Sequence, residues 1–73
     1  MITVEQFTQM VKNHDLTYMY SDDGAVSRRG FESLQAIKTA AKDLDPRVVK
    51  TIWNAEVDKC LAEGYRKDFY WRG

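Results

Sequence analysis

The sequence contains one histidine and one cysteine, two residue types that often carry acid–base and nucleophilic chemistry. A hydrolytic site would need such a base and nucleophile within hydrogen-bonding reach of each other. His14 stands beside Asp15 after the first helical segment, where a partly exposed histidine is expected. Cys60 falls on the apolar face of a later helix, where cysteine usually behaves as a small hydrophobic residue. We therefore predict that the two residues do not form a catalytic pair. A single cysteine also excludes an internal disulfide and a zinc site of several cysteines.

Two adjacent aspartates follow a pair of tyrosines in the segment YMYSDD, residues 18–23. The segment resembles the tyrosine and double-aspartate hairpin of reverse transcriptases, in which the aspartates hold catalytic magnesium. Ser21 separates the tyrosine from the acidic pair here, and a polymerase also needs a third carboxylate and a much larger palm. Asp22 and Asp23 are better explained as turn formers, and their spacing does not fit an EF-hand. The sequence predicts no metal, no cofactor and no enzymatic activity.

Basic residues occur together at residues 28–29, and basic residues are interleaved with aromatic ones at residues 65–72. Basic side chains bind phosphate and aromatic rings stack on bases, so the combination favours single-stranded nucleic acid. If the segments converge, the candidate nucleic-acid-binding residues are Arg28, Arg29, Arg66, Lys67 and Arg72. Eleven basic and eleven acidic residues cancel, however, and zero net charge argues against a general nucleic-acid or membrane-surface binder. The competing interpretation places the rings in the core and the arginines in solvent.

Aromatic residues are plentiful for 73 residues, with three Phe, four Tyr and two Trp. Tyr18 and Tyr20 lie on one face of a predicted strand and Met19 on the other, and so small a domain cannot easily bury both faces. Tyrosine and tryptophan are favoured anchors of protein interfaces. The candidate partner-binding residues are therefore Tyr18, Tyr20, Tyr70 and Trp71, with ordinary use in the core as the alternative.

The first of the elements that must position these residues is a helix at residues 3–13. Thr3 and Gln6 have the spacing of a capping box. Val4, Phe7 and Val11 then fall on one face, as in an amphipathic helix.

A β-hairpin is predicted next, with strands at residues 16–20 and 25–28 and a turn at residues 21–24. Asp-Gly between runs of β-forming residues favours a tight turn, because glycine accepts a positive φ. An isolated hairpin is marginal in water, so this one must lie against the helices.

Two further helices follow, at residues 31–44 and 46–63, with Gly30 at the start of the former. Asp45 is a natural N-cap and Pro46 fits the first helical position, while Gly64 is a suitable stop. The expected core faces, from the helical spacing, contain Phe31, Leu34, Ile37, Ala41 and Leu44, and then Val49, Ile52, Trp53, Val57, Cys60 and Leu61. At least two of the aromatic residues after Gly64 are expected to pack back on the fold.

The predicted fold is one α+β domain, residues 1–73, in which three short helices carry a hairpin between the first and the second. An all-α three-helix domain is the alternative. No apolar run reaches the length of a membrane span and no signal peptide is visible. Together with the lack of disulfides in so small a domain, this predicts a cytoplasmic protein.

The segments YSDDGAVSRRG at residues 20–30, IWN at residues 52–54 and FYW at residues 69–71 resemble short uncharacterised proteins of tailed bacteriophages and prophages. Such proteins are often accessory factors, so the resemblance implies a host or phage protein as the partner and supplies no catalytic residues. The expected function is a small non-enzymatic protein-binding module, which could also self-associate. A small nucleic-acid-binding protein is the alternative.

Overall fold

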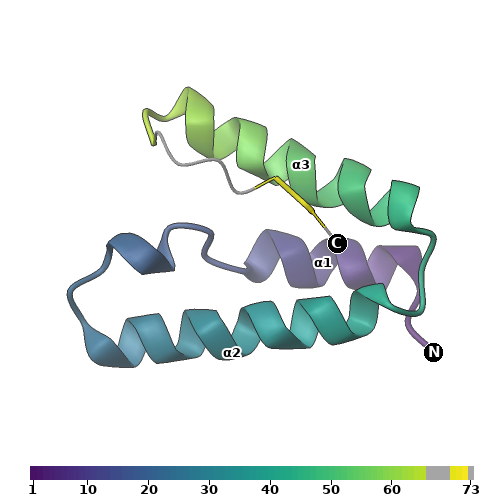
Figure 1. Cartoon of the computed structure of the whole chain (residues 1–73), viewed down its shortest axis with the longest axis horizontal. Coiled ribbons are helices and arrows are strands. Elements are labelled where there is room, and N and C mark those ends of the chain that lie inside the picture. The colour runs from purple at the N-terminus through teal and green to yellow at the C-terminus, as the bar shows by residue number, and fades with distance from the viewer. Residues whose placement is uncertain (66–69, 73) are drawn as a thin grey trace.

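The computed structural model describes residues 1–65 and 70–72, and these form three α-helices and one short 3-10 helix (Figure 1). Their order is α1 (Val4–Asn13), η1 (Tyr18–Tyr20), α2 (Gly24–Ala41) and α3 (Pro46–Ala62). In Figure 1, α1 lies between α2 and α3, and it packs against both of them. η1 packs against α2.

Local capping signals explain where α1 and α3 begin. The backbone N–H of Gln6 donates to Thr3 Oγ1 at 3.1 Å, and the N–H of Thr3 donates to Gln6 Oε1 at 3.0 Å. This confirms the predicted capping box. At α3, Asp45 Oδ1 accepts from the N–H of Arg47 at 2.9 Å, and Pro46 occupies the first turn as predicted. Helix α3 ends at Ala62, and Gly64 follows it with a positive φ of 107°.

The predicted β-hairpin is wrong, because residues 1–65 and 70–72 contain no strand. Residues 18–20 form η1, and α2 begins directly after Asp23. The carboxylate of Asp23 accepts from the N–H of Ala25 at 2.8 Å and thereby caps the helix. Gly24 is helical and has no positive φ of the kind that the predicted turn required. The described residues therefore form an all-helical domain, which the sequence analysis held as its alternative.

Helix α2 starts seven positions before the predicted boundary of residues 31–44, and this changes the place of Gly30. Gly30 lies inside the helix and is buried. A Cβ at Gly30 would overlap the Tyr18 side chain, with 2.6 Å to Cδ2, so the ring of Tyr18 packs directly on the helix backbone. Phe31, which was predicted to face the core, is 56% exposed. Gly30, not Phe31, occupies the buried face at this turn of the helix.

The core is assembled from all three α-helices and the connection between α1 and η1. Its buried hydrophobic residues are Phe7, Val11, Leu16, Ile37, Val49, Trp53 and Val57. Two tail aromatics, Tyr70 and Trp71, pack against this core, as predicted. Phe69 lies outside the described residues.

Candidate functional site

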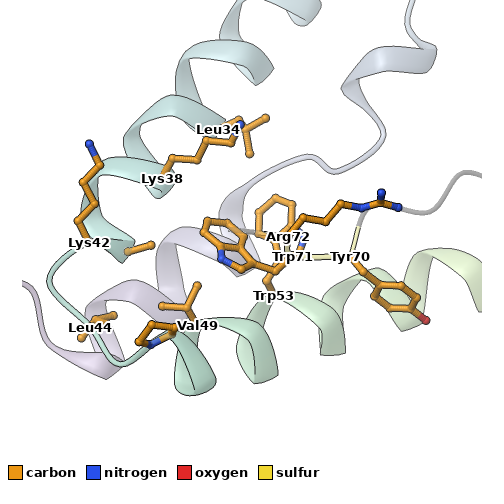
Figure 2. A pocket seen from close by; sticks show the side chains of 11 residues that line it. Leu34, Lys38, Lys42, Leu44, Val49, Trp53, Tyr70, Trp71 and Arg72 are labelled. Atoms are coloured by element: carbon orange, nitrogen blue, oxygen red, sulfur yellow. The ribbon is translucent and has the colours of Figure 1, made fainter.

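An apolar groove of about 650 Å³ lies between α2, the first half of α3 and residues 70–72, which we call the C-terminal segment (Figure 2). Its volume is in the range of pockets that bind ligands. The uncharged side chains that line it are Leu34, Ala41, Leu44, Pro46, Val49, Trp53, Tyr70 and Trp71. Among the described residues, the charged side chains of the lining are all basic, namely Lys38, Lys42 and Arg72.

Both tryptophans of the chain contribute to the groove. Trp53 comes from α3 and is only 4% exposed, whereas Trp71 is half-buried. Their ring centroids are 5.5 Å apart with an interplanar angle of 65°, an edge-to-face contact that is favourable for aromatic rings. The His14 ring lies 5.7 Å from Trp53. Trp71 thus rests on an indole that the core already holds in place.

The C-terminal segment is fixed to α3 by two hydrogen bonds. The backbone N–H of Trp71 donates to Asn54 Oδ1 at 2.8 Å, and the hydroxyl of Tyr70 donates to Asp58 Oδ1 at 2.5 Å. Asn54 and Asp58 are four positions apart and so lie on one side of α3. The segment therefore runs back along α3, and in Figure 2 the Tyr70 ring points away from the indoles. This arrangement places Trp71 over the groove.

Lys38 lies in the last turn of α2 and Lys42, four residues later, is its C-cap, so their Cβ atoms are about 6 Å apart. Neither lysine forms an ion pair within residues 1–65 and 70–72. Asp43 and Asp45 flank the lining residue Leu44 in sequence, but neither belongs to the described lining, and Asp45 is engaged with Arg47 at 3.1 Å. Helical periodicity alone places Lys38 and Lys42 on the solvent side of this element. Only the return of the C-terminal segment shows that they border a groove.

The four candidate partner-binding residues divide into two pairs. Tyr70 and Trp71 both line the groove. Tyr18 instead packs on Gly30, and its ring centroid lies 5.7 Å from that of His14. Tyr20 is 49% exposed and lies against the ring of Tyr65, with 5.1 Å between centroids. Neither Tyr18 nor Tyr20 belongs to the groove lining.

The candidate nucleic-acid-binding residues are not gathered on one surface in the part of the chain that the structure describes. Arg28 and Arg29 are exposed in the N-terminal half of α2. Arg72 lines the groove with Lys38, which is about 15 Å farther along α2 than Arg28 at a rise of about 1.5 Å per residue. Arg66 and Lys67 lie outside the described residues.

His14 is buried, with 8% exposure, and not partly exposed as expected. A hydrogen bond of 2.9 Å links its Nδ1 to Ser33 Oγ on α2, and its Nε2 has no hydrogen-bond partner among the described residues. Burial lowers the pKa of His14, and the charge of Asp15 partly opposes this effect. The ring therefore stays neutral and acts as a structural link between the end of α1 and α2.

Cys60 shows no sign of nucleophilic activation. Burial raises the pKa of its thiol, and the charges of Glu63, Glu56 and Asp15 raise it further. A reactive cysteine needs the opposite shift, because the thiolate is the nucleophile. No hydrogen bond joins Cys60 to His14 within the described residues, and no three His, Cys, Asp or Glu residues there could hold a metal ion together.

Comparison with protein-family models, with curated proteins and with solved structures finds no match for this chain. The resemblance to bacteriophage proteins therefore stays a prediction. Within the part of the chain that the structure describes, no helix is both long enough and apolar enough to cross a membrane.

Proposed function

We propose that this protein is a small protein-binding module that holds apolar side chains of a partner protein in the groove between α2, α3 and the C-terminal segment. The observation that carries this proposal is an accessible apolar groove lined by two indoles, one of which, Trp53, belongs to the buried core. Tryptophan and tyrosine are over-represented among the residues that dominate binding energy at interfaces. Trp71 is positioned as such an anchor.

The chemistry of the lining favours a protein partner over a nucleic acid. Leu34, Leu44 and Val49 complement aliphatic or aromatic side chains, and they offer no hydrogen bonds to the edges of bases. Trp53 is buried and contacts Trp71 edge to face, so the indoles do not form an open stacking platform for successive bases. Arg28 and Arg29, which a phosphate-binding surface was expected to include, are not part of the lining.

Substitution of Trp71 tests the proposal with peptides selected from a random display library against the wild-type protein. In Trp71→Ala, we expect the dissociation constants of the selected peptides to rise at least about tenfold, as for an anchor residue. Labelled peptides and fluorescence anisotropy give these constants for every variant. Tyr20→Ala is the matched control, because it removes an exposed aromatic ring outside the groove.

Circular dichroism must first show that both variants keep the helical content of the wild type. Peptides that bind Trp71→Ala as tightly as the wild type, or that lose affinity equally in Tyr20→Ala, would contradict the assignment of the groove. Failure to select any peptide would contradict the proposed function itself.

A further inference from the structure

The described lining of the groove carries only positive charge, in a chain whose formal net charge is zero. Among the described residues, Lys38, Lys42 and Arg72 line it, and no aspartate or glutamate does. Lys38 and Lys42 have no ion-pair partner within residues 1–65 and 70–72. An occupant of the groove would therefore meet apolar side chains along its centre and positive charge at the α2 edge.

We propose that the bound segment of the partner is acidic and amphipathic, with apolar side chains in the groove and two carboxylates against Lys38 and Lys42. This inference rests on the proposed function and names the chemical class of the partner. Charge complementarity supports it, because the potentials of two interacting surfaces are opposite in sign at specific interfaces. Long lysine side chains can cover apolar surface with their methylene groups while the ammonium reaches the partner.

The spacing of the lysines indicates which acidic pattern fits. Lys38 and Lys42 are about 6 Å apart at their Cβ atoms, one turn of α2. Two acidic residues at positions i and i+4 of a helical partner have the same separation, so both can face a lysine at once. Leu34 and Lys42 span about 12 Å along α2, which is the length of roughly two helical turns. A short amphipathic helix therefore matches the α2 edge of the groove.

Three pools of synthetic helical peptides without tryptophan test the inference. The pools share one randomised apolar face, and they carry Glu, Gln or Lys at two fixed positions four residues apart. Binding is followed by the emission of Trp53 and Trp71, the chain's two tryptophans, which both line the groove. We expect the Glu pool to bind about tenfold more tightly than the Gln pool, and the Lys pool to bind most weakly. Raising the salt concentration should reduce these differences.

Reversal of the two lysine charges provides the decisive comparison. Lys38→Glu with Lys42→Glu should invert the order, so that the Lys pool binds best. Arg28→Glu with Arg29→Glu is the matched control, since it makes the same charge change on α2 outside the groove lining, and it should keep the wild-type order. If the first pair of substitutions disturbs folding, Lys38→Gln with Lys42→Gln should reduce the preference for the Glu pool, and the charge of Arg72 would account for what remains.

The outcomes separate the inference from the proposed function. If the Gln pool binds as tightly as the Glu pool, the acidic partner is excluded and the protein-binding groove stands. If no pool binds, both proposals fail. Dodecanoate and a twelve-residue oligothymidylate are titrated in parallel. If dodecanoate or the oligothymidylate binds more tightly than every peptide, and Lys38→Glu with Lys42→Glu removes this tighter binding, the occupant is a fatty acid or a nucleic acid. That result would overturn the inference.

Discussion

At the scale of single residues, His14 makes the stability of the fold depend on pH. It is the chain's only histidine, and burial lowers its pKa from 6.5 in spite of the nearby Asp15. Between the folded and the unfolded pKa values the unfolded chain binds more protons, so stability rises with pH. We expect the free energy of unfolding to be at its maximum above about pH 6.5 and to decrease as the pH falls from there through the folded pKa. Urea titrations between pH 7.5 and pH 5 measure this decline.

The matched variant for this prediction is His14→Asn, whose amide can replace Nδ1 in the bond to Ser33. It should unfold with nearly the same free energy across that pH range. Hydrogen bonds from Thr17 and Arg47 lower the pKa values of Asp15 and Asp45 from 3.8, so the stability that these carboxylates contribute is constant in this pH range and is lost only below about pH 3.8. A slope that persists in His14→Asn would show that another group is responsible.

Gly30 is a second residue whose role depends on one contact. Alanine is favoured over glycine inside a helix by about 1 kcal/mol. In Gly30→Ala, however, the new methyl group would overlap the Tyr18 side chain, and overpacking of this kind typically costs about 1–3 kcal/mol. We expect a net loss of stability in chemical denaturation. In a Tyr18→Ala background the same substitution should be stabilising. Equal effects in both backgrounds would mean that the Tyr18 contact is not responsible.

At the scale of elements, the start of α2 rests on Asp23. Asp23→Ala removes the carboxylate that accepts from the N–H of Ala25, and loss of such a cap costs about 0.5–2 kcal/mol. Asp22→Ala is the control, because this neighbouring acid is exposed and makes no hydrogen bond in the described structure. Asp22→Ala should change the free energy of unfolding by no more than about 0.5 kcal/mol. Thermal unfolding followed by circular dichroism compares the two, and equal losses would argue against the cap.

The helices that could be predicted from the sequence are defined by interactions between near neighbours, whereas the start of α2 depends on a contact between residues distant in sequence. Capping at Thr3 and at Asp45 involves neighbours within three positions, so α1 and α3 could be predicted. Asp-Asp-Gly at residues 22–24 suits a hairpin turn as well as a helix start, and a contact distant in sequence decides between them. The Tyr18 ring lies against the helix backbone at Gly30, so this contact forms only when residue 30 is part of a helix. Strand propensity is weaker than such tertiary packing.

At the scale of the whole molecule, the groove depends on segments that meet only after folding. Composition was enough to single out Tyr70 and Trp71 as candidate contacts, and both line the groove. Lys38 and Lys42 were not singled out, because helical periodicity alone assigns them to solvent. Their place beside the groove follows from the return of the C-terminal segment along α3, which no local pattern predicts.

Asn54 fixes this segment beside the groove, because its Oδ1 accepts from the backbone N–H of Trp71 at 2.8 Å. In Asn54→Ala the N–H of Trp71 loses its acceptor, at a cost of about 1 kcal/mol. We expect Trp71 to become more accessible to acrylamide, measured by fluorescence quenching in a Trp53→Phe background in which Trp71 is the sole tryptophan. Asn13→Ala at the exposed end of α1 is the matched control and should leave quenching unchanged. Unchanged quenching in Asn54→Ala would mean that packing on the core holds Trp71 without this bond. In that case peptide binding should be equally insensitive to Asn54, because the groove would keep its shape.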